Sequence, residues 1–384
     1  MQSKLTASAV AVAGLLAGLV ASGAANAQQA QEVKLGFAAP LTGAQAHYGK
    51  DMQNGIQLAV DEYNATKPTI EGKPVKFVLQ AEDDQADPRQ GSLVAQKLVD
   101  NGIKGMLGHF NSGTTIPASR IYAQAGIPEI AMATAPEYTK QGFKTTFRMM
   151  TSDIQQGSVV GTFAVKKLGF KNIAIVDDRT AYGQGLADEF EKAAKAAGGK
   201  IVRREFANDK AVDFRAILTN LKRSNPDVVF YGGADAQAGP LAKQMRELGI
   251  KATLMAGEMV KSDAFLKIAG DASNGSVVSL AGLPLDKMPG GAAYESRYKA
   301  KFGAGPETYS PYAYDGAMAM MSAMKKANST DPAKYLTVLA KTSMPGVTTR
   351  ELAYDAQGDL KYGSITLYKV VDGKWTVLET VGGK

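Results

Sequence analysis

The sequence contains no cysteine, and it has only two histidines, His47 and His109, among 384 residues. Without cysteine there can be no disulfide, no catalytic thiolate and no lipid-modified N-terminal cysteine. Two histidines are too few for a histidine metal cluster. The sequence also lacks a GxxxxGK[ST] phosphate loop and a GxGxxG fingerprint. We therefore expect no metal, no cofactor and no thiol chemistry.

Charge of one sign is also not concentrated anywhere in the chain. The 44 basic and 37 acidic residues are interspersed and give a net charge of +7. No basic run with interleaved aromatic residues indicates a nucleic-acid partner. We interpret the charges as a solvated surface and predict that the protein binds no nucleic acid.

Long apolar runs are absent except near the N-terminus. The run from Leu5 to Gly23 follows Lys4 and is followed by the small-residue sequence "ANA". This pattern is typical of a cleaved signal peptide, although a membrane anchor is the alternative. We expect residues 1–27 to be removed and the mature chain to begin at Gln28. No later run is long enough to span a bilayer.

Apolar strands alternate with amphipathic helices along most of the remaining chain. Strands are expected at 32–41, 74–84, 103–110, 128–133, 172–178, 200–207, 227–233 and 252–258. Helices are expected at 48–65, 87–102, 114–125, 183–197, 213–223, 238–249, 291–302 and 311–327. This alternation predicts an α/β fold with parallel sheets covered on both faces.

The length favours two domains, with a seam near 147–157. The two halves on either side of it share the strand–helix rhythm. The tail from Arg350 reads as a β-meander, with turns in "DAQGD" and "VDGK".

Small polar residues end two neighbouring predicted strands. The sequence "NSGTT" at 111–115 contains Ser112 and Thr114, and "MATAP" at 132–136 contains Thr134. Ligands of parallel sheets bind outside the carboxyl ends of the strands, and hydroxyls with helix N-terminal N–H groups suit an anion such as a carboxylate. Helix capping is the alternative for either cluster alone. Two clusters on adjacent strands favour a binding site.

Glu258 ends the predicted strand 252–258 and would face the same kind of crevice, unless it is a surface residue at a turn. A hydrolase using Ser112 is the enzyme alternative, because His109 lies three residues before it. However, no GxSxG motif surrounds Ser112, and no Asp–His pair is apparent. We therefore expect no catalytic residues and no enzymatic activity.

Seven motifs in order resemble the periplasmic leucine/isoleucine/valine-binding proteins, which are type I receptors of branched-chain amino-acid ABC importers. They are "GAQAHYGKDMQNGIQLAVDEYNA", "DDQADPRQ", "NGIKGMLGHFNSGTTIPAS", "ATAPEYT", "IAIVDDRTAYGQGLADEF", "DVVFYGG" and "LMAGE". The resemblance is collinear over nearly the whole mature chain. It implies two Rossmann-like lobes with parallel sheets, joined by three crossovers, with the ligand held between them. Mapped here, lobe 1 is 31–149 plus 281–349, and lobe 2 is 150–280 plus 350–384.

The resemblance also implies roles for individual residues. Ser112 and Thr134 would donate hydroxyl and backbone N–H groups to the ligand carboxylate. The backbone around Met132, Ala133 and Thr134 would offer a carbonyl to the ammonium, and Glu258 would pair with the ammonium from the other lobe. Further implied ligand contacts are Tyr182, which closes the cleft, and Tyr48 and Tyr309, which flank the ligand side chain.

Several positions depart from the pattern of the family. Ala86 and Asn111 stand where members often carry a cysteine pair, Ala234 stands where a tyrosine can occur, and Met132 replaces a smaller residue. The ligand is therefore expected to be an amino acid, branched-chain or hydrophobic. Another small carboxylate, an aromatic acid or an amide is the alternative, and an exported α/β hydrolase is a remote one. The implied setting is a monomer in the periplasm that delivers the ligand to the permease subunits of an ABC importer.

Overall fold

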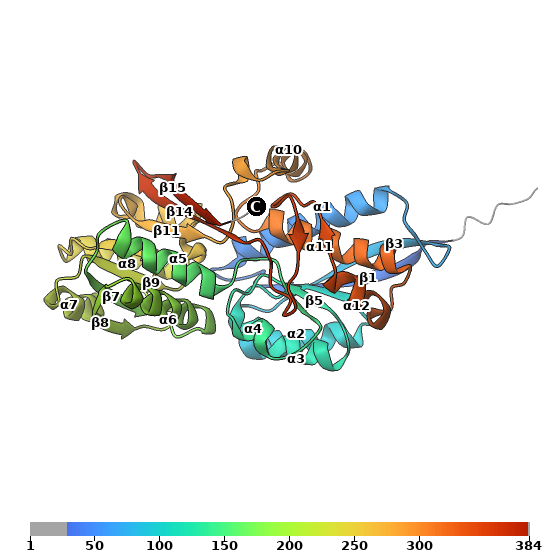
Figure 1. The fold of residues 1–384 in the computed structure, drawn as a ribbon, viewed down its shortest axis with the longest axis horizontal. Coiled ribbons are helices and arrows are strands. Elements are labelled where there is room, and N and C mark those ends of the chain that lie inside the picture. Colours follow the sequence, from blue (N-terminus) through green and yellow to red (C-terminus); the bar gives the residue numbers. More distant parts are fainter. Residues whose placement is uncertain (1–28, 383–384) are drawn as a thin grey trace, which may run out of the picture.

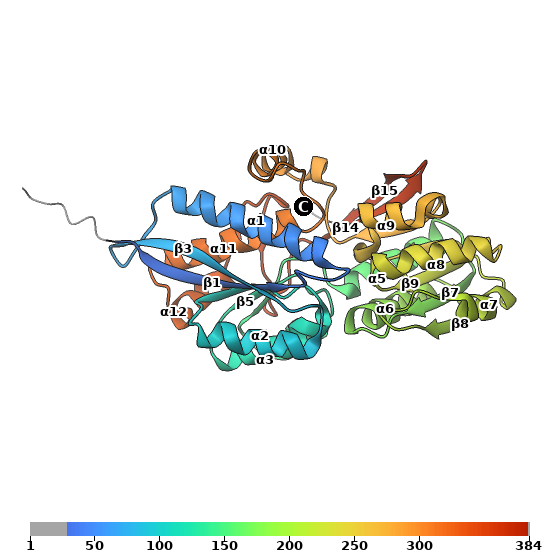
Figure 2. The same cartoon turned by 180° about the vertical axis from the view of Figure 1, so that it is seen from behind.

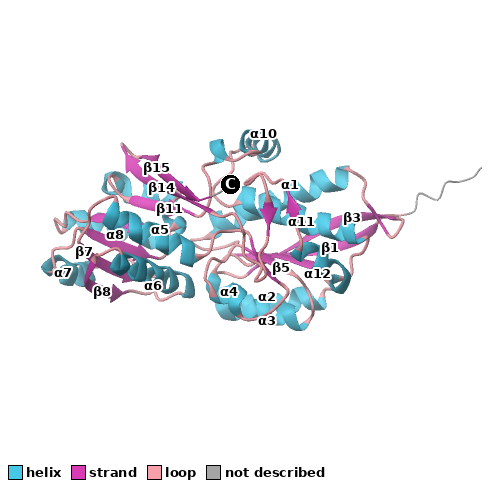
Figure 3. Cartoon of the chain, viewed as in Figure 1, coloured by secondary structure: helices cyan, strands magenta, loops and turns pink. Residues whose placement is uncertain are grey.

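The chain folds into two lobes that lie side by side along the longest axis of the molecule (Figure 1). The computed structural model describes residues 29–382, so the predicted signal peptide at 1–27 lies outside the described residues. Each lobe is a β-sheet enclosed by helices (Figure 3). This is the α/β architecture that the alternation of strands and helices predicts.

The first lobe is built on a six-stranded sheet in the order β2-β3-β1-β4-β5-β6. Its strands are β1 Gln31–Ala39, β2 Thr69–Ile70, β3 Lys73–Asp83, β4 Gly105–Gly108, β5 Glu129–Ala131 and β6 Thr146–Arg148. All neighbours are parallel except β2, which runs antiparallel to β3. The carboxyl ends of β4 and β5 therefore meet at one edge and bring the two polar clusters together.

Helices cover both faces of this sheet. They are α1 Ala46–Ala65, α2 Pro88–Asp100, α3 Ser112–Gln124, α4 Glu137–Lys140, α10 Gly291–Phe302, α11 Ser310–Ala327 and α12 Pro332–Ala340. Two opposite views place α1 and α11 above the sheet and α2 and α3 below it (Figures 1 and 2). Helices α1 and α11 also contact each other. Gly55 of α1 permits this close approach, because a Cβ there would lie 2.3 Å from the carbonyl oxygen of Ser310 in α11.

The buried carboxylate of Asp51 fixes the start of α11. It accepts backbone N–H hydrogen bonds from Glu307 at 2.9 Å and from Tyr309 and Ser310 at 2.8 Å each. The first N–H groups of a helix have no partner within the helix, so Asp51 satisfies donors that would otherwise be lost in the core. Tyr309 is thereby held at the edge of the first lobe that faces the second.

The second lobe is built on a seven-stranded sheet in the order β15-β14-β11-β10-β9-β7-β8. Its strands are β7 Asn172–Asp177, β8 Lys200–Phe206, β9 Val228–Gly232, β10 Thr253–Ala256, β11 Val277–Leu280, β14 Ser364–Val371 and β15 Lys374–Gly382. β14 and β15 run antiparallel to their neighbours, so this sheet is mixed rather than wholly parallel. They form the meander expected in the tail, and Asp372 and Gly373 at its turn both have positive φ, as a tight hairpin requires.

Helices also cover both faces of the second sheet. They are α5 Asp153–Lys166, α6 Ala181–Ala196, α7 Arg215–Arg223, α8 Asp235–Glu247 and α9 Asp263–Ala269, with short 3₁₀ turns at η1 Glu258–Val260 and η2 Gly270–Ser273. Alternate residues of β7 serve the two faces. Ile175 packs in the cluster that contains Phe190 of α6, whereas Val176 packs in the cluster that contains Leu218 of α7. This two-sided burial explains why the strand is a continuous apolar run.

Several elements were not predicted from the sequence, among them β6, β11, α5, α9 and α12. In α5 the reason is visible, because Gly157 and Gly161 weaken the helical pattern of its sequence. A Cβ at Gly157 would lie 2.6 Å from Cβ of Glu189, and one at Gly161 would lie 2.6 Å from the carbonyl oxygen of Phe190. The glycines that hide the helix from sequence reasoning are therefore the ones that let α5 pack closely on α6.

The chain passes between the two sheets three times, after β6, after β11 and before β14. The first two passages lie near 150 and 280, where we propose the first two boundaries. Before the third, β12 Ser343–Met344 pairs with β13 Leu352–Ala353, and Asp359 pairs with Arg148 of the first sheet. We therefore propose that the third boundary lies near 361 rather than at 350.

Candidate functional site

A small, partly enclosed cavity lies between the lobes. The first lobe lines it with residues that follow β4 and β5 and with a residue at the start of α11. The second lobe lines it with residues of α6 and η1. These residues are Phe110, Asn111, Ser112, Met132, Thr134, Tyr182, Glu258, Met259 and Tyr309. We call this space the inner cavity. It contains six of the residues that the sequence proposes as ligand contacts, and Tyr48, Ala133 and Ala234 do not line it.

The two polar clusters are joined by a hydrogen bond. Ser112 is the first residue of α3 and is buried, and its Oγ accepts the backbone N–H of Ala135 at 3.3 Å. Thr114 has a different role, because its hydroxyl donates to the carbonyl oxygen of Asn111 at 3.0 Å. The Thr114 hydroxyl thus bonds within the first turn of α3 and caps no N–H group, whereas Ser112 spans the gap between neighbouring strand ends.

In the segment after β5, some residues line the inner cavity, and backbone carbonyls of the segment make hydrogen bonds that hold it in place. The side chains of Met132 and Thr134 line the cavity. Ala133 packs with Tyr138, and its carbonyl oxygen accepts a hydrogen bond from Nη1 of Arg148. The carbonyl oxygen of Thr134 is also engaged, because it accepts the backbone N–H of Asp153 at 2.9 Å. The carbonyls of Ala133 and Thr134 thus brace the segment.

Glu258 starts η1, separated from the end of β10 at Ala256 by Gly257 alone, and is buried in the second-lobe wall. Its Oε2 accepts hydrogen bonds from Nε2 of Gln156 at 2.5 Å and from the hydroxyl of Tyr182 at 2.9 Å. Burial raises the pKa of Glu258, and the bonds from Gln156 and Tyr182 lower it only in part. Burial and the charge of Glu258 raise the pKa of Tyr182 well above its usual value, so this hydroxyl stays protonated and donates.

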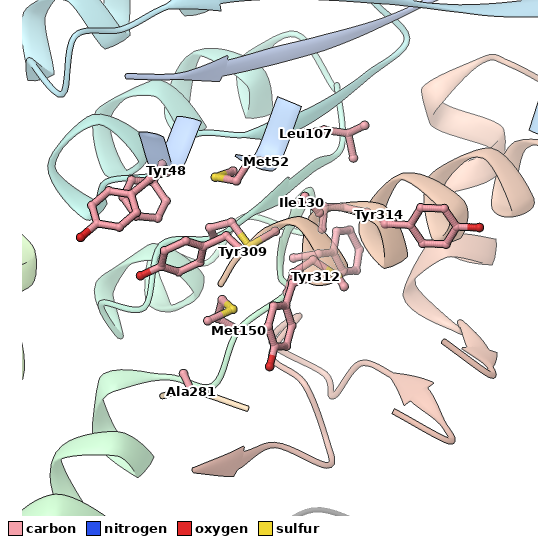
Figure 4. Packing of buried hydrophobic residues seen from close by; sticks show 14 of the residues in the cluster. Tyr48, Met52, Leu107, Ile130, Met150, Ala281, Tyr309, Tyr312 and Tyr314 are labelled. Atoms are coloured by element: carbon pink, nitrogen blue, oxygen red, sulfur yellow. The ribbon is translucent and has the colours of Figure 1, made fainter. Parts of the chain in front are cut away.

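Aromatic rings form the first-lobe side of the site. The ring of Tyr309 meets that of Phe110 edge-on at 4.8 Å and that of Tyr48 edge-on at 5.5 Å, measured between centroids. Figure 4 shows Tyr48 and Tyr309 beside each other among the buried residues of this lobe. The hydroxyl of Tyr309 is buried and has no hydrogen-bond partner among the described residues.

Direct contacts join the lobes next to the inner cavity. The hydroxyl of Tyr48 donates to the carbonyl oxygen of Met259 in η1. Nε2 of His47 lies 3.1 Å from Oδ2 of Asp235 at the start of α8, and that oxygen also accepts the hydroxyl of Ser262 at 2.6 Å. The structure is therefore a closed form, in which the two lobes touch around the cavity.

Comparison with known proteins gives this arrangement a family. Residues 32–374 match the family described as "Periplasmic binding protein". The chain belongs to the periplasmic binding proteins. It is 36% identical over 352 residues to "Leu/Ile/Val-binding protein homolog 1" of Brucella abortus (strain 2308), covering 91% of this chain and 94% of the relative. It is 35% identical over 348 residues to "Amino acid binding protein" of Pseudomonas aeruginosa, covering 90% and 92%.

Solved structures agree with the two-lobed type I fold of this periplasmic binding protein. A leucine-binding protein from Thermotoga maritima matches with a TM-score of 0.83 at 25% identity, covering 91% of this chain and 98% of the other. A branched-chain amino acid transporter substrate-binding protein from Streptococcus pneumoniae, in complex with isoleucine, matches with a TM-score of 0.82 at 26% identity. The match covers 92% of this chain and 100% of the other. A solute-binding protein from Rhodopseudomonas palustris BisB5, in complex with 3,4-dihydroxybenzoic acid, matches at 0.80 and 26%, covering 92% and 98%.

A second cavity of this periplasmic binding protein adjoins the first and opens toward solvent; we call it the outer cavity. It shares Asn111, Tyr182 and Met259 with the inner cavity, and its other lining residues include Ala86 and Ala234. Ala234 therefore lines the outer cavity and does not share a cavity with Tyr309. No helix among residues 29–382 has the length and apolar character needed to cross a membrane.

Sequence reasoning missed Asp153 and Gln156, both on α5. Asp153 is fully buried, and Nε2 of Gln156 lies 3.4 Å from its Oδ1 and bonds Glu258 at the same time. Oε1 of Gln156 in turn accepts the hydroxyl of Ser279 at 2.8 Å. A polar "SD" pair before an apolar helix was the available signal, because it marks a helix N-terminus.

Proposed function

We propose that this periplasmic binding protein is a receptor that captures an amino acid between its lobes. The observation that carries the proposal is the inner cavity, in which Ser112 and Thr134 stand on one wall and Glu258 on the other. A carboxylate suits the hydroxyls and the start of α3, and an ammonium suits the carboxylate of Glu258. A zwitterion satisfies both walls at once.

The ligand we propose is a branched-chain or other hydrophobic amino acid. Relatives that match over nearly the whole chain include a Leu/Ile/Val-binding protein homologue, a leucine-binding protein and a receptor in complex with isoleucine. The rings of Phe110 and Tyr309, with Met132 and Met259, supply apolar lining for such a side chain. We further propose that the monomeric receptor works in the periplasm and delivers the ligand to the permease subunits of an ABC importer.

An aromatic acid is the second candidate, because the Rhodopseudomonas palustris BisB5 structure that this chain resembles contains 3,4-dihydroxybenzoic acid. The aromatic wall around Tyr309 would accept such a ring. An acid without an ammonium would, however, leave the carboxyl group of Glu258 without a cationic partner. This difference favours the amino acid.

We propose that the protein has no catalytic activity. In a hydrolase that used Ser112, a histidine would have to activate its hydroxyl. His109 is fully buried, with Nδ1 at 2.7 Å from Asp84 and Nε2 at 3.1 Å from the hydroxyl of Tyr122. The bonds of His109 thus run to Asp84 and Tyr122, which supports a receptor that releases its ligand unchanged.

A thermal-shift screen of amino acids and organic acids tests the proposal. A ligand at a thousandfold excess over its Kd should stabilise the protein by about 4 kcal/mol. We expect leucine, isoleucine or valine to give the largest shift, and recovery of the ligand should show it unchanged. A shift with aromatic acids and none with amino acids would replace the first proposal with the second.

A further inference from the structure

Two carboxyl groups are buried together in the second-lobe wall, and the proposed function uses only one of them. The amide of Gln156 joins the two, with Nε2 at 2.5 Å from Oε2 of Glu258 and at 3.4 Å from Oδ1 of Asp153. The exposed fraction of Glu258 is 3%, and Asp153 has none. Oδ2 of Asp153 has no hydrogen-bond partner among the described residues.

No cation neutralises this pair. Among residues 29–382, no ion pair involves Asp153 or Glu258. Arg148 is the cation whose charge reaches Asp153, but its guanidinium is bonded elsewhere. Its partners are the carboxylate of Asp359, the carbonyls of Ala133 and Ala135, and the hydroxyl of Thr139.

The groups facing the pair leave it short of positive charge. Burial raises the pKa of Asp153 well above its usual value, and the charge of Glu258 raises it further. The hydroxyl of Thr134, the charge of Arg148 and the amide of Gln156 offset this increase only in part. Tyr182 and Tyr309 also face Glu258, and burial followed by the charge of Glu258 raises the pKa of each hydroxyl, so both are neutral. Two carboxyls in such a space cannot both be ionised at low cost.

We propose that Asp153 and Glu258 act as one acid pair that holds a proton in the empty closed cleft and releases it to solvent when an ammonium ligand binds. This inference rests on the proposed function, because it needs a ligand that carries an ammonium. One O–H bond breaks, the proton passes to water, and the ammonium keeps its own protons. The positive charge of the ligand beside Glu258 then compensates for the loss of the proton from the pair.

The exchange defines the chemical class of the ligand more narrowly than Glu258 alone does. A cation can replace the proton, whereas a neutral or anionic ligand leaves the proton where it is. Amino-acid affinity should therefore rise with pH over the range in which the pair would otherwise hold its proton, by up to about tenfold per pH unit. The affinity for a 2-oxo acid should show no such rise.

Calorimetry in two buffers with different ionisation enthalpies counts the protons released on binding. The ligand is the amino acid that gives the largest thermal shift, and every protein carries His47→Gln, so that this imidazole takes up no proton on closure. We expect about one proton to be released per ligand bound. Asp153→Asn should still bind the amino acid, because the amide fills the same space, but it should release almost none.

Asp178→Asn is the matched control. Asp178 is also buried, and it lies at the outer cavity with its pKa raised by burial to about 6. Proton release should survive this change, and its loss here would assign the proton to Asp178 and overturn the inference. Infrared difference spectra should show a protonated-carboxyl band that disappears on ligand binding, and Asp153→Asn should lack this band.

The outcomes separate the two proposals. If no amino acid binds, the proposed function fails and this inference fails with it. If an amino acid binds tightly and releases no proton at any pH between 5 and 8, only the acid pair is wrong. If Asp153→Asn does not fold, the pH dependence of Kd in the protein carrying only His47→Gln decides, since a flat profile excludes the exchange.

Discussion

The two walls of the inner cavity differ in charge. The first-lobe wall offers hydroxyls, aromatic rings and an amide but no charged side chain, whereas the second-lobe wall contains the carboxylate of Glu258. A ligand with separated charges therefore finds a place for its anionic end on one lobe and for its cationic end on the other. Only the closed form makes both sets of contacts, so such a ligand shifts the population toward closure.

The largest effect should come from removing the charge of the second-lobe wall. Glu258→Gln should weaken amino-acid binding by about 2–5 kcal/mol, because the ligand ammonium then lacks its buried partner. Binding of the deaminated 2-oxo acid should change much less. Calorimetry on the two proteins and two ligands completes the cycle. Equal affinity of the wild type for both ligands would contradict the ammonium role of Glu258.

Substitutions in the first-lobe wall should change ligand affinity by the same amount whether or not the ligand carries an ammonium. Ser112→Ala should weaken the amino acid and the 2-oxo acid equally, by about 1.5–3 kcal/mol, because both ligands carry the carboxylate that the hydroxyl would bond. Thr114→Val is the control, since its hydroxyl bonds Asn111 within the first lobe. It should lower thermal stability and leave both affinities unchanged. Unequal losses for the two ligands in Ser112→Ala would place the carboxylate elsewhere.

A smaller effect is expected where the two lobes touch. Tyr48→Phe removes the hydrogen bond to Met259 and should weaken binding by about 0.5–1.5 kcal/mol. Small-angle scattering at a fixed, subsaturating ligand concentration should show less compaction than in the wild type. Tyr63→Phe is matched to it, because that hydroxyl donates to the carbonyl of Met321 within one lobe at 3.2 Å. If both variants bind equally well, the Tyr48 contact does not stabilise closure.

The smallest effect should be a dependence on pH at the edge of the site. Burial lowers the pKa of His47, but the hydrogen bond to Asp235 and the charges of Asp235 and Glu307 outweigh it, so the pKa in the closed form is raised. The stabilisation of the closed form is therefore complete below about pH 6.5 and is lost as the pH rises through the raised pKa. We expect it to be worth about 0.2–1 kcal/mol.

Calorimetry over this pH range, with Asp153→Asn in both proteins to remove the opposing proton release, tests the role of His47. Affinity should fall as the pH rises in the protein that retains His47, and the fall should be absent when His47→Gln is added. A fall of the same size in both proteins would assign the dependence to another group.

The periodicity of the sequence was sufficient for most of the fold, because strands buried on both faces and amphipathic helices leave strong patterns. The edges of the lobes were harder. The antiparallel addition of β14 depends on where the tail returns, and nothing local to Ser364–Val371 encodes it. α5 was missed because Gly157 and Gly161 serve tertiary packing rather than helix propensity.

The candidate site was predicted unevenly for the same reason. Ser112 and Thr134 follow neighbouring predicted strands of one sheet, and Glu258 ends a predicted strand of the other sheet, so each lies at a carboxyl-terminal strand end where ligands bind. Asp153 belongs to the missed helix and was missed with it. The direction of the Ala133 carbonyl depends on its hydrogen bond from Arg148, and nothing in the sequence indicates that these two residues are in contact. Single backbone groups are directed by such remote partners, and strand and helix patterns carry no information about them.

The hydrogen bond that Tyr48 makes to the second lobe uses a main-chain oxygen as its acceptor. Met259 lines the inner cavity, so a substitution there changes the lining. The backbone carbonyl that accepts the bond from Tyr48 remains whichever residue replaces Met259. Substitutions at 259 could therefore change which ligands fit while the closing contact persists. A receptor built in this way can change its ligand specificity one residue at a time. The side chain at this position contacts the ligand, whereas the backbone carbonyl of the same residue makes the contact that closes the lobes.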